Sequence, residues 1–526
     1  MIKRLGWRGC PMGEWTDERA PDRRAMLRLA AQATVAGLGA GLLPGAAQAA
    51  ESIPEAPQSP DERAWRELRG LLGEGGRLRR PGESGYLETA LPKNRRYANV
   101  RPAGIVSCRS TQGVSVAVRW ARKHSVSLVP RSGGHNYAGH STTYGLLVDL
   151  SPMNSVRPRR TAGRPRLIVG GGATNSHVYQ NQRYDLYFPG GRCPGVGVAG
   201  LTLGGGLGFN DRKWGMTCDL LTETELVLPD GTVVRASERE NSDLLWACQG
   251  GGGGNFGINT EFTFGAVDVS RLVSTVFDLT FDAEHGVALL RSLREIIERD
   301  RRHDFDCRLQ FSGANGRTGP QVNVLGHYLG RRAPLERLLA EVLALNPTRR
   351  FIDERGFWRS QEYLLAPAET TALVSKSLAP SGWPDDDAAE AIVDWTRRWR
   401  SRGPGNTGYV TLFAMGGATA EVAPRDTAFP HRNAKYIFDI GARWAQNASD
   451  YVIDQSLAAV TEMYDDLRRR AHTSAAYVNF PDPALRRWWD AYYGPNYHRL
   501  TKIKQQYDPT RFFRHAQSVG SALTVM

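Results

Sequence analysis

The chain has 526 residues, 41% hydrophobic and 23% charged, a balance typical of a folded globular protein and unlike that of a disordered one. Its formal net charge is +13, but the arginines are spread along the chain and form no long basic run, so nucleic-acid binding is not expected. Beyond the N-terminal region no apolar run reaches the roughly 18 residues that a membrane span needs. We therefore expect a globular protein of about three domains or fewer, without stable membrane insertion.

Residues 1–50 have the pattern of an export signal. Arg23 and Arg24 precede a modest apolar stretch, and Ala47-Gln48-Ala49 follows it. The pattern is similar to a twin-arginine signal, whose route carries folded proteins across a membrane. The alternative interpretation is an arginine-rich leader with one short helix. We expect the export signal and hence an exported protein, with residues 51–95 leading into the first domain.

Cysteine spacing argues against a structural metal site. There is no C-x-x-C pair, so zinc has no support, and we expect no metal. Five cysteines follow the leader, an odd number, so at least one thiol lacks a disulfide partner within the chain. Cys193 is the candidate because it lies at the start of an unusual glycine-rich stretch. The five are Cys108, Cys193, Cys218, Cys248 and Cys307.

The periodicity of apolar residues predicts an α+β unit over residues 96–267, after a helix at 62–72. A helix is expected at 111–124, with Thr111 as its cap, and another through Tyr179. Strands are expected at 105–106, 128–130, 146–150, 166–169, 220–228, 232–235 and 260–264.

A second α+β unit is predicted over residues 268–470, followed by a C-terminal segment, 471–526. Helices are expected at 284–299, 335–345 and 453–470. Strands are expected at 274–281, 305–312, 322–329, 409–415 and 436–440. The aromatic residues of the C-terminal segment, such as Trp488 and Tyr492, are better explained as core packing than as a surface for stacking sugars.

The stretch Gly190–Gly208, GGRCPGVGVAGLTLGGGLG, is too rich in glycine for a helix interior, since each glycine there costs roughly 1 kcal/mol. Its valines and leucines favour a packed loop that offers N–H groups to anionic oxygens over a flexible connector. His135 lies in RSGGHNYAGHS, directly after a predicted strand. His135 and His140 do not form a convincing metal pair, because flexible glycines separate them. Neither a P-loop nor a clear dinucleotide fingerprint is present.

The order of four motifs is more informative than any one of them. RSGGH, GRCPGVGVAGLTLGGGLG, WACQGGGGGNFGI and YYGPNYHRLTKIKQQYDPTRFF together resemble the berberine bridge enzyme-like flavin oxidases of the vanillyl-alcohol oxidase superfamily. The resemblance runs from about Tyr97 to Val519. It implies a two-domain α+β fold. Residues 96–267 would form an FAD-binding domain of the p-cresol methylhydroxylase type, and residues 268–470 an inserted substrate domain with an antiparallel sheet. Residues 471–526 would return to the FAD domain.

The resemblance also implies FAD bound covalently at two points. His135 matches the histidine that attaches to the methyl carbon of the flavin ring, and Cys193 matches the cysteine that attaches to the neighbouring ring carbon. The residues expected to wrap the pyrophosphate are Arg131, Ser132, Gly133, Gly134 and Asn136. Those expected to line the flavin are Gly200, Gly204, Gly205, Gly206, Gly208, Gly257 and Ile258.

The general base departs from the family pattern. Relatives carry Y-x-N-Y and use its second tyrosine to take the substrate's proton, whereas this chain has Phe480 at that position. Tyr409 is the first candidate, with Tyr477 and Tyr144 as others, and a core role for these tyrosines is at least as plausible. A reaction that needs no tyrosine at position 480 is the third interpretation. Asp439 and His431 either assist or are structural.

The resemblance implies an FAD-dependent oxidase that dehydrogenates a bulky alcohol, sugar or natural product. Hydride would pass to the flavin, and O2 would be reduced to H2O2. Two alternatives stay open: a flavin dehydrogenase that uses another acceptor, and a catalytically silent binding protein that keeps the flavin fold.

Overall fold

The computed structural model describes residues 60–159, 165–365 and 370–524, all of which belong to one compact unit. The predicted export signal at 1–50 lies outside the described residues, as do residues 51–59 of the lead-in. Within the described part of the chain, no helix combines the length and the apolar character needed to cross a bilayer.

A four-stranded sheet opens the described chain, in the order β1-β2-β4-β3. Strands β2, β4 and β3 are parallel, and β1 pairs antiparallel with β2. Their bounds are Gly76–Arg79 for β1, Gly104–Cys108 for β2, Leu128–Arg131 for β3 and Leu146–Asp149 for β4. Because parallel strands share one direction, the loop that carries His135 leaves the sheet at its carboxyl edge.

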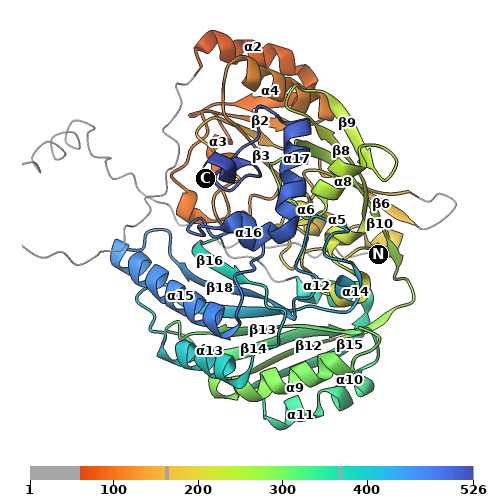
Figure 1. Cartoon of the computed structure of the whole chain (residues 1–526), viewed down its shortest axis with the longest axis vertical. Helices are drawn as coiled ribbons and strands as arrows, with labels where there is room; N and C mark the ends of the chain where they lie inside the picture. Colours follow the sequence, from red (N-terminus) through yellow and green to blue (C-terminus); the bar gives the residue numbers. More distant parts are fainter. Residues whose placement is uncertain (1–59, 160–164, 366–369, 525–526) are drawn as a thin grey trace, which may run out of the picture. The chain divides into compact units, whose positions relative to one another are not determined.

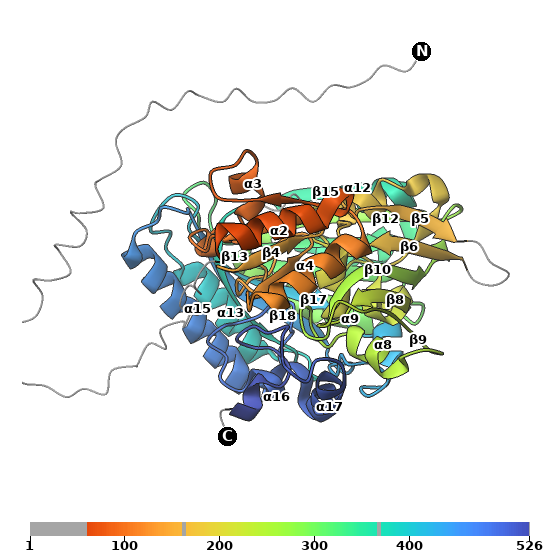
Figure 2. The same ribbon diagram turned by 90° about the horizontal axis from the view of Figure 1, so that it is seen from above.

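Two amphipathic helices, α2 (Glu62–Leu72) and α4 (Thr111–Lys123), lie side by side against this sheet (Figure 2). Their buried faces meet at Trp65 and Trp120, whose ring centroids are 4.8 Å apart. Ser110, and not the predicted Thr111, caps α4, because its side chain accepts the N–H of Gly113.

A second, five-stranded antiparallel sheet has the order β5-β6-β10-β8-β9. Its bounds are Val156–Arg159 for β5, Arg166–Gly170 for β6, Leu221–Val227 for β8, Val233–Ser237 for β9 and Ile258–Gly265 for β10. A two-stranded ribbon joins β7 (Leu186–Tyr187) to β11 (Val267–Asp268). The short helices of this half are α3 (Tyr86–Ala90), α5 (Asn175–Tyr179), α6 (Val198–Leu203), α7 (Asp211–Trp214) and α8 (Ser242–Cys248).

A seven-stranded antiparallel sheet forms the centre of the second half, in the order β15-β12-β14-β13-β17-β18-β16. Its bounds are Val273–Asp282 (β12), Phe305–Ser312 (β13), Gln321–Tyr328 (β14), Arg349–Gly356 (β15), Ala372–Leu378 (β16), Thr407–Ala414 (β17) and Tyr436–Trp444 (β18).

Helices cover one face of this sheet (Figure 1). They are α9 (Gly286–Arg299), α10 (Arg332–Leu338), α11 (Ala340–Ala344), α13 (Asp386–Arg398) and α15 (Asp450–Arg470). Helix α12 (Phe357–Leu364) packs against β12, β14 and β15 through Leu364, which clusters with Val276 and Leu325, and α14 (Ala418–Glu421) packs against α7. Residues such as Phe311, Val410 and Ile440 fill the core between sheet and helices. Because successive strand residues point to opposite faces, their neighbours along each strand are presented on the other face. We call the part of it that carries Gln310, Thr411 and Asp439 the polar face.

The C-terminal segment packs back onto the first half of the chain, through α16 (Trp488–Tyr493) and α17 (Tyr497–Tyr507). The buried Lys504 ammonium donates to the carboxylate of Asp508 at 2.7 Å and also to the backbone carbonyl of Asn255. Trp488 and Tyr492 are buried in the same core cluster as the five-stranded sheet, as the core-packing interpretation expected.

The α+β class and most predicted elements are confirmed. Two further predictions are wrong. Residues 198–203 of the glycine-rich stretch form the helix α6, because Val198, Ala199 and Leu203 bury one side of a short turn despite Gly200. The single helix expected at 335–345 is two helices, α10 and α11, which meet at Leu339. Strands β1, β5, β7, β11, β15 and β16 were not predicted.

Candidate active site

Two loops meet backbone to backbone beside the parallel sheet. A Cβ added at Gly133 would lie 2.3 Å from the amide nitrogen of Gly197, and one added at Gly197 would lie 2.3 Å from the amide nitrogen of Gly133. No side chain fits at either position, so the two backbones can approach this closely only because both residues are glycine. The contact brings the loop that carries His135 against the loop that carries Cys193.

His135 is partly buried at this junction, and its Nε2 atom is fully buried. Its Nε2 lies 3.1 Å from the position that a Cβ on Gly195 would take, and it has no hydrogen-bond partner among the described residues. Burial lowers the pKa of His135 to about 4, with a smaller contribution from Lys93, so the ring is neutral near pH 7. Buried nitrogens normally have a partner, so a neutral imidazole with an unpartnered buried nitrogen indicates that His135 meets a group that the chain itself does not contain.

The Cys193 thiol is free and partly buried, and Asn175 fixes its backbone by donating to the Cys193 carbonyl at 2.9 Å. Burial raises the pKa of the thiol, and three guanidinium groups oppose that rise. They belong to Arg443, Arg308 and Arg192. Two of these three come from the seven-stranded sheet, so the Cys193 end of the glycine-rich stretch lies near the polar face of that sheet.

The other residues of the His135 loop divide by role. The Arg131 guanidinium donates to the backbone carbonyls of Ser141 at 2.7 Å and Thr89 at 2.6 Å, and the Asn136 side chain accepts the N–H groups of Ala138 and His140. These side chains shape the loop. Ser132 Oγ is buried without a partner in the described chain, so it is available to a ligand, as are backbone groups of the loop.

The predicted flavin-lining glycines lie around the same junction. Gly204, Gly205, Gly206 and Gly208 follow α6 and pack against the C-terminal segment and Gly190, whereas Gly200 is on the exposed side of α6. Gly257 approaches the carbonyl of Val227. The side chain of Ile258 is buried in the core of the parallel sheet, so only its backbone is open to a ligand role.

Tyr409 and Asp439 lie on neighbouring strands of the polar face. Tyr409 pairs with Gly441 and Asp439 pairs with Thr411, so both side chains point the same way. A Cβ at Gly441 would lie 2.4 Å from the Tyr409 hydroxyl, so the phenol ring extends over Gly441 toward Asp439.

Burial sets the protonation of this pair. It raises the pKa of Asp439 to about 6, although Ser375 donates to that carboxylate at 2.6 Å. Burial and then the Asp439 charge hold the pKa of Tyr409 well above its ordinary value. Near pH 7 the tyrosine is therefore a neutral phenol and Asp439 is mostly a carboxylate, which makes Asp439 the better proton acceptor.

The structure gives Tyr477 and Phe480 other neighbours. The Tyr477 hydroxyl accepts the N–H of Gly206 at 2.9 Å and the side-chain amide of Asn479 at 3.1 Å. Phe480 stacks on Tyr137, with ring centroids 5.7 Å apart, and lies 5.6 Å from the ring of Phe413. Tyr477 therefore braces the glycine-rich stretch, while Phe480 contributes to an aromatic wall.

Two further candidates are not brought to this cluster. His431 packs its ring on Phe429 next to the C-terminal segment, and burial lowers its pKa to about 4. Tyr144 precedes β4, at the amino ends of the parallel strands, where its carbonyl accepts the N–H of Ala103. His135 follows their carboxyl ends, so Tyr144 is at the opposite edge of the sheet.

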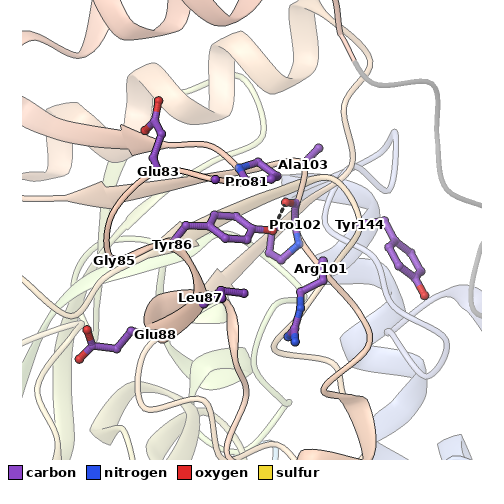
Figure 3. A pocket seen from close by; sticks show the side chains of 11 residues that line it. Pro81, Glu83, Gly85, Tyr86, Leu87, Glu88, Arg101, Pro102, Ala103 and Tyr144 are labelled. Atoms are coloured by element: carbon purple, nitrogen blue, oxygen red, sulfur yellow. Dashed lines mark hydrogen bonds between the residues drawn. The ribbon is translucent and has the colours of Figure 1, made fainter. Parts of the chain in front are cut away.

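Tyr144 instead lines an open cavity of about 690 Å³ (Figure 3). Tyr86 lies across the cavity and donates to the Pro102 carbonyl at 2.6 Å. Among the other lining residues are Arg101 and Glu88. This cavity is separate from the junction of His135 and Cys193.

Several residues of the site were not predicted from the sequence. Tyr137 has no signal of its own within its loop, and Arg308 and Arg443 resemble solvated charges when the sequence is read alone. A signal was present for Arg308: together with Gln310 and Ser312 it alternates with buried apolar residues along β13, which is the pattern of a strand with one polar face.

The FAD binding domain model matches residues 102–237, and the model described as berberine and berberine like matches residues 476–520. The protein of Bacillus subtilis (strain 168) named uncharacterized FAD-linked oxidoreductase YgaK is 30% identical over 426 residues, which cover 80% of this chain and 91% of that protein. The chain belongs to the berberine bridge enzyme-like family of FAD-linked oxidoreductases.

Solved structures agree with this membership. Berberine bridge enzyme-like 1 of Physcomitrella patens is 29% identical, with a TM-score of 0.76 over 86% of this chain and 98% of that one. Glucooligosaccharide oxidase of Acremonium strictum, which is described with a 6-S-cysteinyl, 8α-N1-histidyl FAD, is 24% identical, with a TM-score of 0.76 over 86% of this chain and 98% of that one. The predicted family and two-domain α+β FAD fold are thus confirmed. This berberine bridge enzyme-like protein is an FAD-linked oxidoreductase.

Proposed function

We propose that this enzyme dehydrogenates a bulky alcohol, sugar or hydroxylated natural product, with FAD covalently bound to both His135 and Cys193. The overall reaction converts the carbinol and O2 into a carbonyl product and H2O2. One observation carries the proposal: the Gly133–Gly197 contact brings an unpartnered buried imidazole and a free thiol to one junction. The FAD of glucooligosaccharide oxidase is described as cysteinyl and histidyl, the same two residue types.

The residues present fit such a group. His135 Nε2 and Ser132 Oγ are buried polar atoms without partners in the described chain, and the thiol of Cys193 is free. Bound FAD would supply the acceptor for a hydride, which no side chain can provide. The chain's own contribution is to hold the cofactor, orient the substrate and move the hydroxyl proton.

Asp439 is the proton acceptor in this proposal, with Tyr409 beside it as the hydroxyl that orients the substrate. At neutral pH Asp439 is mostly ionised and Tyr409 is a neutral phenol, so of the two only the carboxylate is ready to take a proton. Its raised pKa of about 6 also lies close to the working pH, as suits a general base. The resemblance implied a tyrosine at position 480 as the base; in this proposal Asp439, on β18, takes that role. This assignment changes the first sequence interpretation, in which Tyr409 was itself the base.

Acid precipitation tests the attachment. Wild-type protein is expected to retain its yellow colour in the pellet, and the single variants His135→Ala and Cys193→Ala are each expected to retain it through the remaining bond. The double variant is expected to release free flavin. Cys248→Ala, which removes a thiol buried in the core of the five-stranded sheet, is the matched control and is expected to behave like wild type. Release of flavin from wild type would contradict the double attachment.

Anaerobic mixing tests the reaction. Alcohols, sugars and phenolic glycosides are added to the oxidised protein, and bleaching of the visible flavin absorption is followed. Admission of air should restore the colour and produce one H2O2 for each carbonyl formed. Bleaching without rapid reoxidation would identify a dehydrogenase with another acceptor.

We also propose that residues 1–50 direct export and are then removed. The twin arginines and the Ala47-Gln48-Ala49 end support this. Sequencing the N-terminus of secreted protein should find a start near Glu51, and an intact Met1 on secreted protein would contradict removal.

A further inference from the structure

Three arginines gather around Cys193. Arg192 precedes it in the chain, Arg308 extends from β13, and Arg443 extends from β18. All three act electrostatically on the thiol, and Arg192 and Arg443 both act on Arg308. Three like charges in one partly buried region require compensation, because a low dielectric strengthens their repulsion.

Arg192 has its compensation within the protein. Its guanidinium lies between the rings of Phe209 and Phe413, 4.2 and 4.4 Å from their centroids. The buried carboxylates of Asp211 and Asp306 supply opposite charge. Arg192 therefore has a structural role, because its side chain links the glycine-rich stretch to the seven-stranded sheet.

Arg308 and Arg443 differ from Arg192. Arg308 donates to Gln310 Oε1 at 2.6 Å, and the Arg443 guanidinium lies 5.0 Å from the ring centroid of Tyr409. Neither forms an ion pair with a carboxylate in residues 60–159, 165–365 and 370–524. Other arginines do: Arg212, Arg349, Arg350, Arg355 and Arg432 each lie within 4.0 Å of a carboxylate oxygen.

The nearby acids do not neutralise the two guanidiniums. Asp278 acts on Arg308, but its carboxylate already accepts Asn323 and Tyr363 and pairs with Arg349 at 3.2 Å. Asp439 acts electrostatically on Arg443, but the Asp439 carboxylate already accepts a hydrogen bond from Ser375. In the proposed reaction this carboxylate also takes up a proton and so loses its charge. The polar face therefore presents more positive charge than its own carboxylates balance.

Sheet register brings the two arginines to the reacting region. Arg308 pairs with Phe413, and Tyr409 lies on the same strand as Phe413, four residues earlier. Phe413 in turn contacts Phe480 in the aromatic wall. A substrate whose hydroxyl reaches Tyr409 and Asp439 would thus contact Arg308 with another part of its structure.

We propose that the substrate carries a carboxylate that Arg308 and Arg443 bind, so that the enzyme oxidises hydroxy acids such as sugar acids or aromatic acids in preference to neutral alcohols. Planar guanidinium groups donate two parallel hydrogen bonds to a carboxylate, and that geometry makes such pairs strong and directional. The inference rests on the proposed oxidation at this site. It adds the charge of the substrate, which the oxidation alone does not specify.

Matched substrate pairs test it. Glucuronate is compared with glucose, and 4-(hydroxymethyl)benzoate with 4-methylbenzyl alcohol, by anaerobic flavin bleaching. The wild type is expected to favour the acid of a pair by about 10- to 100-fold in kcat/KM, the range for loss of hydrogen bonds to a charged group. Arg308→Gln should remove most of that preference by lowering kcat/KM for the acid about tenfold more than for the neutral partner. Equal or greater kcat/KM for the neutral partners in wild type would overturn the proposal.

Arg350→Gln is the matched control. Arg350 is on the same sheet and pairs with Glu336, but its side chain is half exposed and belongs to edge strand β15. The Arg350→Gln substitution removes one positive charge, as Arg308→Gln does, but away from the site. This variant should therefore keep the wild-type preference for the acid. Loss of the preference in this variant as well would assign the effect to overall charge and contradict a specific site.

Binding of a carboxylate that cannot be oxidised separates this inference from the reaction itself. Benzoate and its neutral analogue benzamide are titrated into the FAD-loaded protein, and the flavin absorption spectrum reports binding. Benzoate should bind at least about tenfold more tightly than benzamide to wild type, and Arg308→Gln should remove the difference. Equal binding would refute the carboxylate site even if substrates bleach the flavin. Failure of every substrate to bleach the flavin would contradict the oxidation, whereas selective benzoate binding would still support the site.

Discussion

The hydroxyl of Tyr477 accepts a hydrogen bond from the backbone N–H of Gly206, 271 positions earlier in the chain. This bond fixes the glycine-rich stretch to the C-terminal segment at a point where neither is a regular element. A tyrosine that relatives' motifs place near the chemistry thus has a structural partner here. The distinction between bracing and catalysis can be tested directly.

Tyr477→Phe should lower the free energy of unfolding by about 1–3 kcal/mol, because it leaves the buried Gly206 N–H without an acceptor. Urea unfolding followed by fluorescence measures this. Tyr451→Phe, on an exposed tyrosine, should change nothing. The rate of flavin reduction at saturating substrate should stay within about threefold of wild type, since a general base contributes at least about a hundredfold. A large loss of rate with unchanged stability would make Tyr477 catalytic.

Gly133→Ala should disrupt the junction of the two loops, because its Cβ would lie 2.3 Å from the amide nitrogen of Gly197. The backbone must move apart, which separates His135 from Cys193. We expect purified protein to contain a much smaller fraction of acid-stable flavin, measured by the ratio of flavin absorbance to protein absorbance in the redissolved pellet.

Gly70→Ala is the control for that substitution. Gly70 lies in α2 with no atom within 4 Å of its ideal Cβ, so alanine should raise stability by about 0.5–1 kcal/mol and leave the flavin content unchanged. If Gly133→Ala also retained full attachment, the close approach of the loops would not be what positions the two residues.

Much of the fold could be predicted from the sequence, since helix and strand periodicity is a local property. The polar alternation of β13 was visible in Arg308, Gln310 and Ser312. What could not be derived is which strands lie next to each other: Arg308 reaches the reacting region only because β13 pairs with β17, about 100 residues later. The hydrogen bond of Tyr477 to Gly206 has no local signal either, because a backbone donor leaves no mark in the sequence.

His135 and Cys193 were predicted by a different route. Resemblance identified both, while spacing alone would have left His135 in a turn and Cys193 as an odd thiol. Physical reasoning adds what resemblance cannot supply, namely why the loops meet. Glycines at 133 and 197 permit a contact that any larger residue would prevent. Resemblance also directed attention to the missing tyrosine at Phe480 and away from Asp439, whose raised pKa of about 6 depends on burial that only the fold provides.

Arg192→Met should destabilise the protein at pH 8 by about 3 kcal/mol, because the buried Asp306 carboxylate would lose the guanidinium that most favours its charged form. Burial raises the pKa of Asp306 to about 6, so its carboxyl is ionised at pH 8 and largely protonated at pH 5. The defect should therefore shrink as the pH falls through 6. Urea unfolding at both pH values measures it, with Arg350→Met as an exposed control. A defect independent of pH would indicate that only the packing between Phe209 and Phe413 was lost.

Asp439→Asn should abolish most flavin reduction without weakening the fold. Flavin reduction in wild type should fall as the pH drops below about 6, where the carboxyl becomes protonated, and Asp439→Asn should lose at least about a hundredfold and lack this pH dependence. Stability should respond oppositely. Folding raises the pKa of this buried carboxyl, so its ionisation destabilises the folded state as the pH rises from the pKa of the unfolded chain toward 6. Removing the charge should therefore leave the urea midpoint of unfolding at pH 7.5 unchanged or higher.

Tyr409→Phe separates the two members of the pair. It keeps the carboxylate and removes only the hydroxyl, so the pH dependence near 6 should persist while the rate falls by about tenfold or more. Stopped-flow reduction between pH 5 and pH 9 distinguishes the two variants, with Tyr451→Phe as the control. If Tyr409→Phe removed the pH dependence and Asp439→Asn kept it, the tyrosine would be the base and Asp439 its partner. If neither variant changed the rate, the proton would leave the substrate by another route, and this strand pair would serve packing alone.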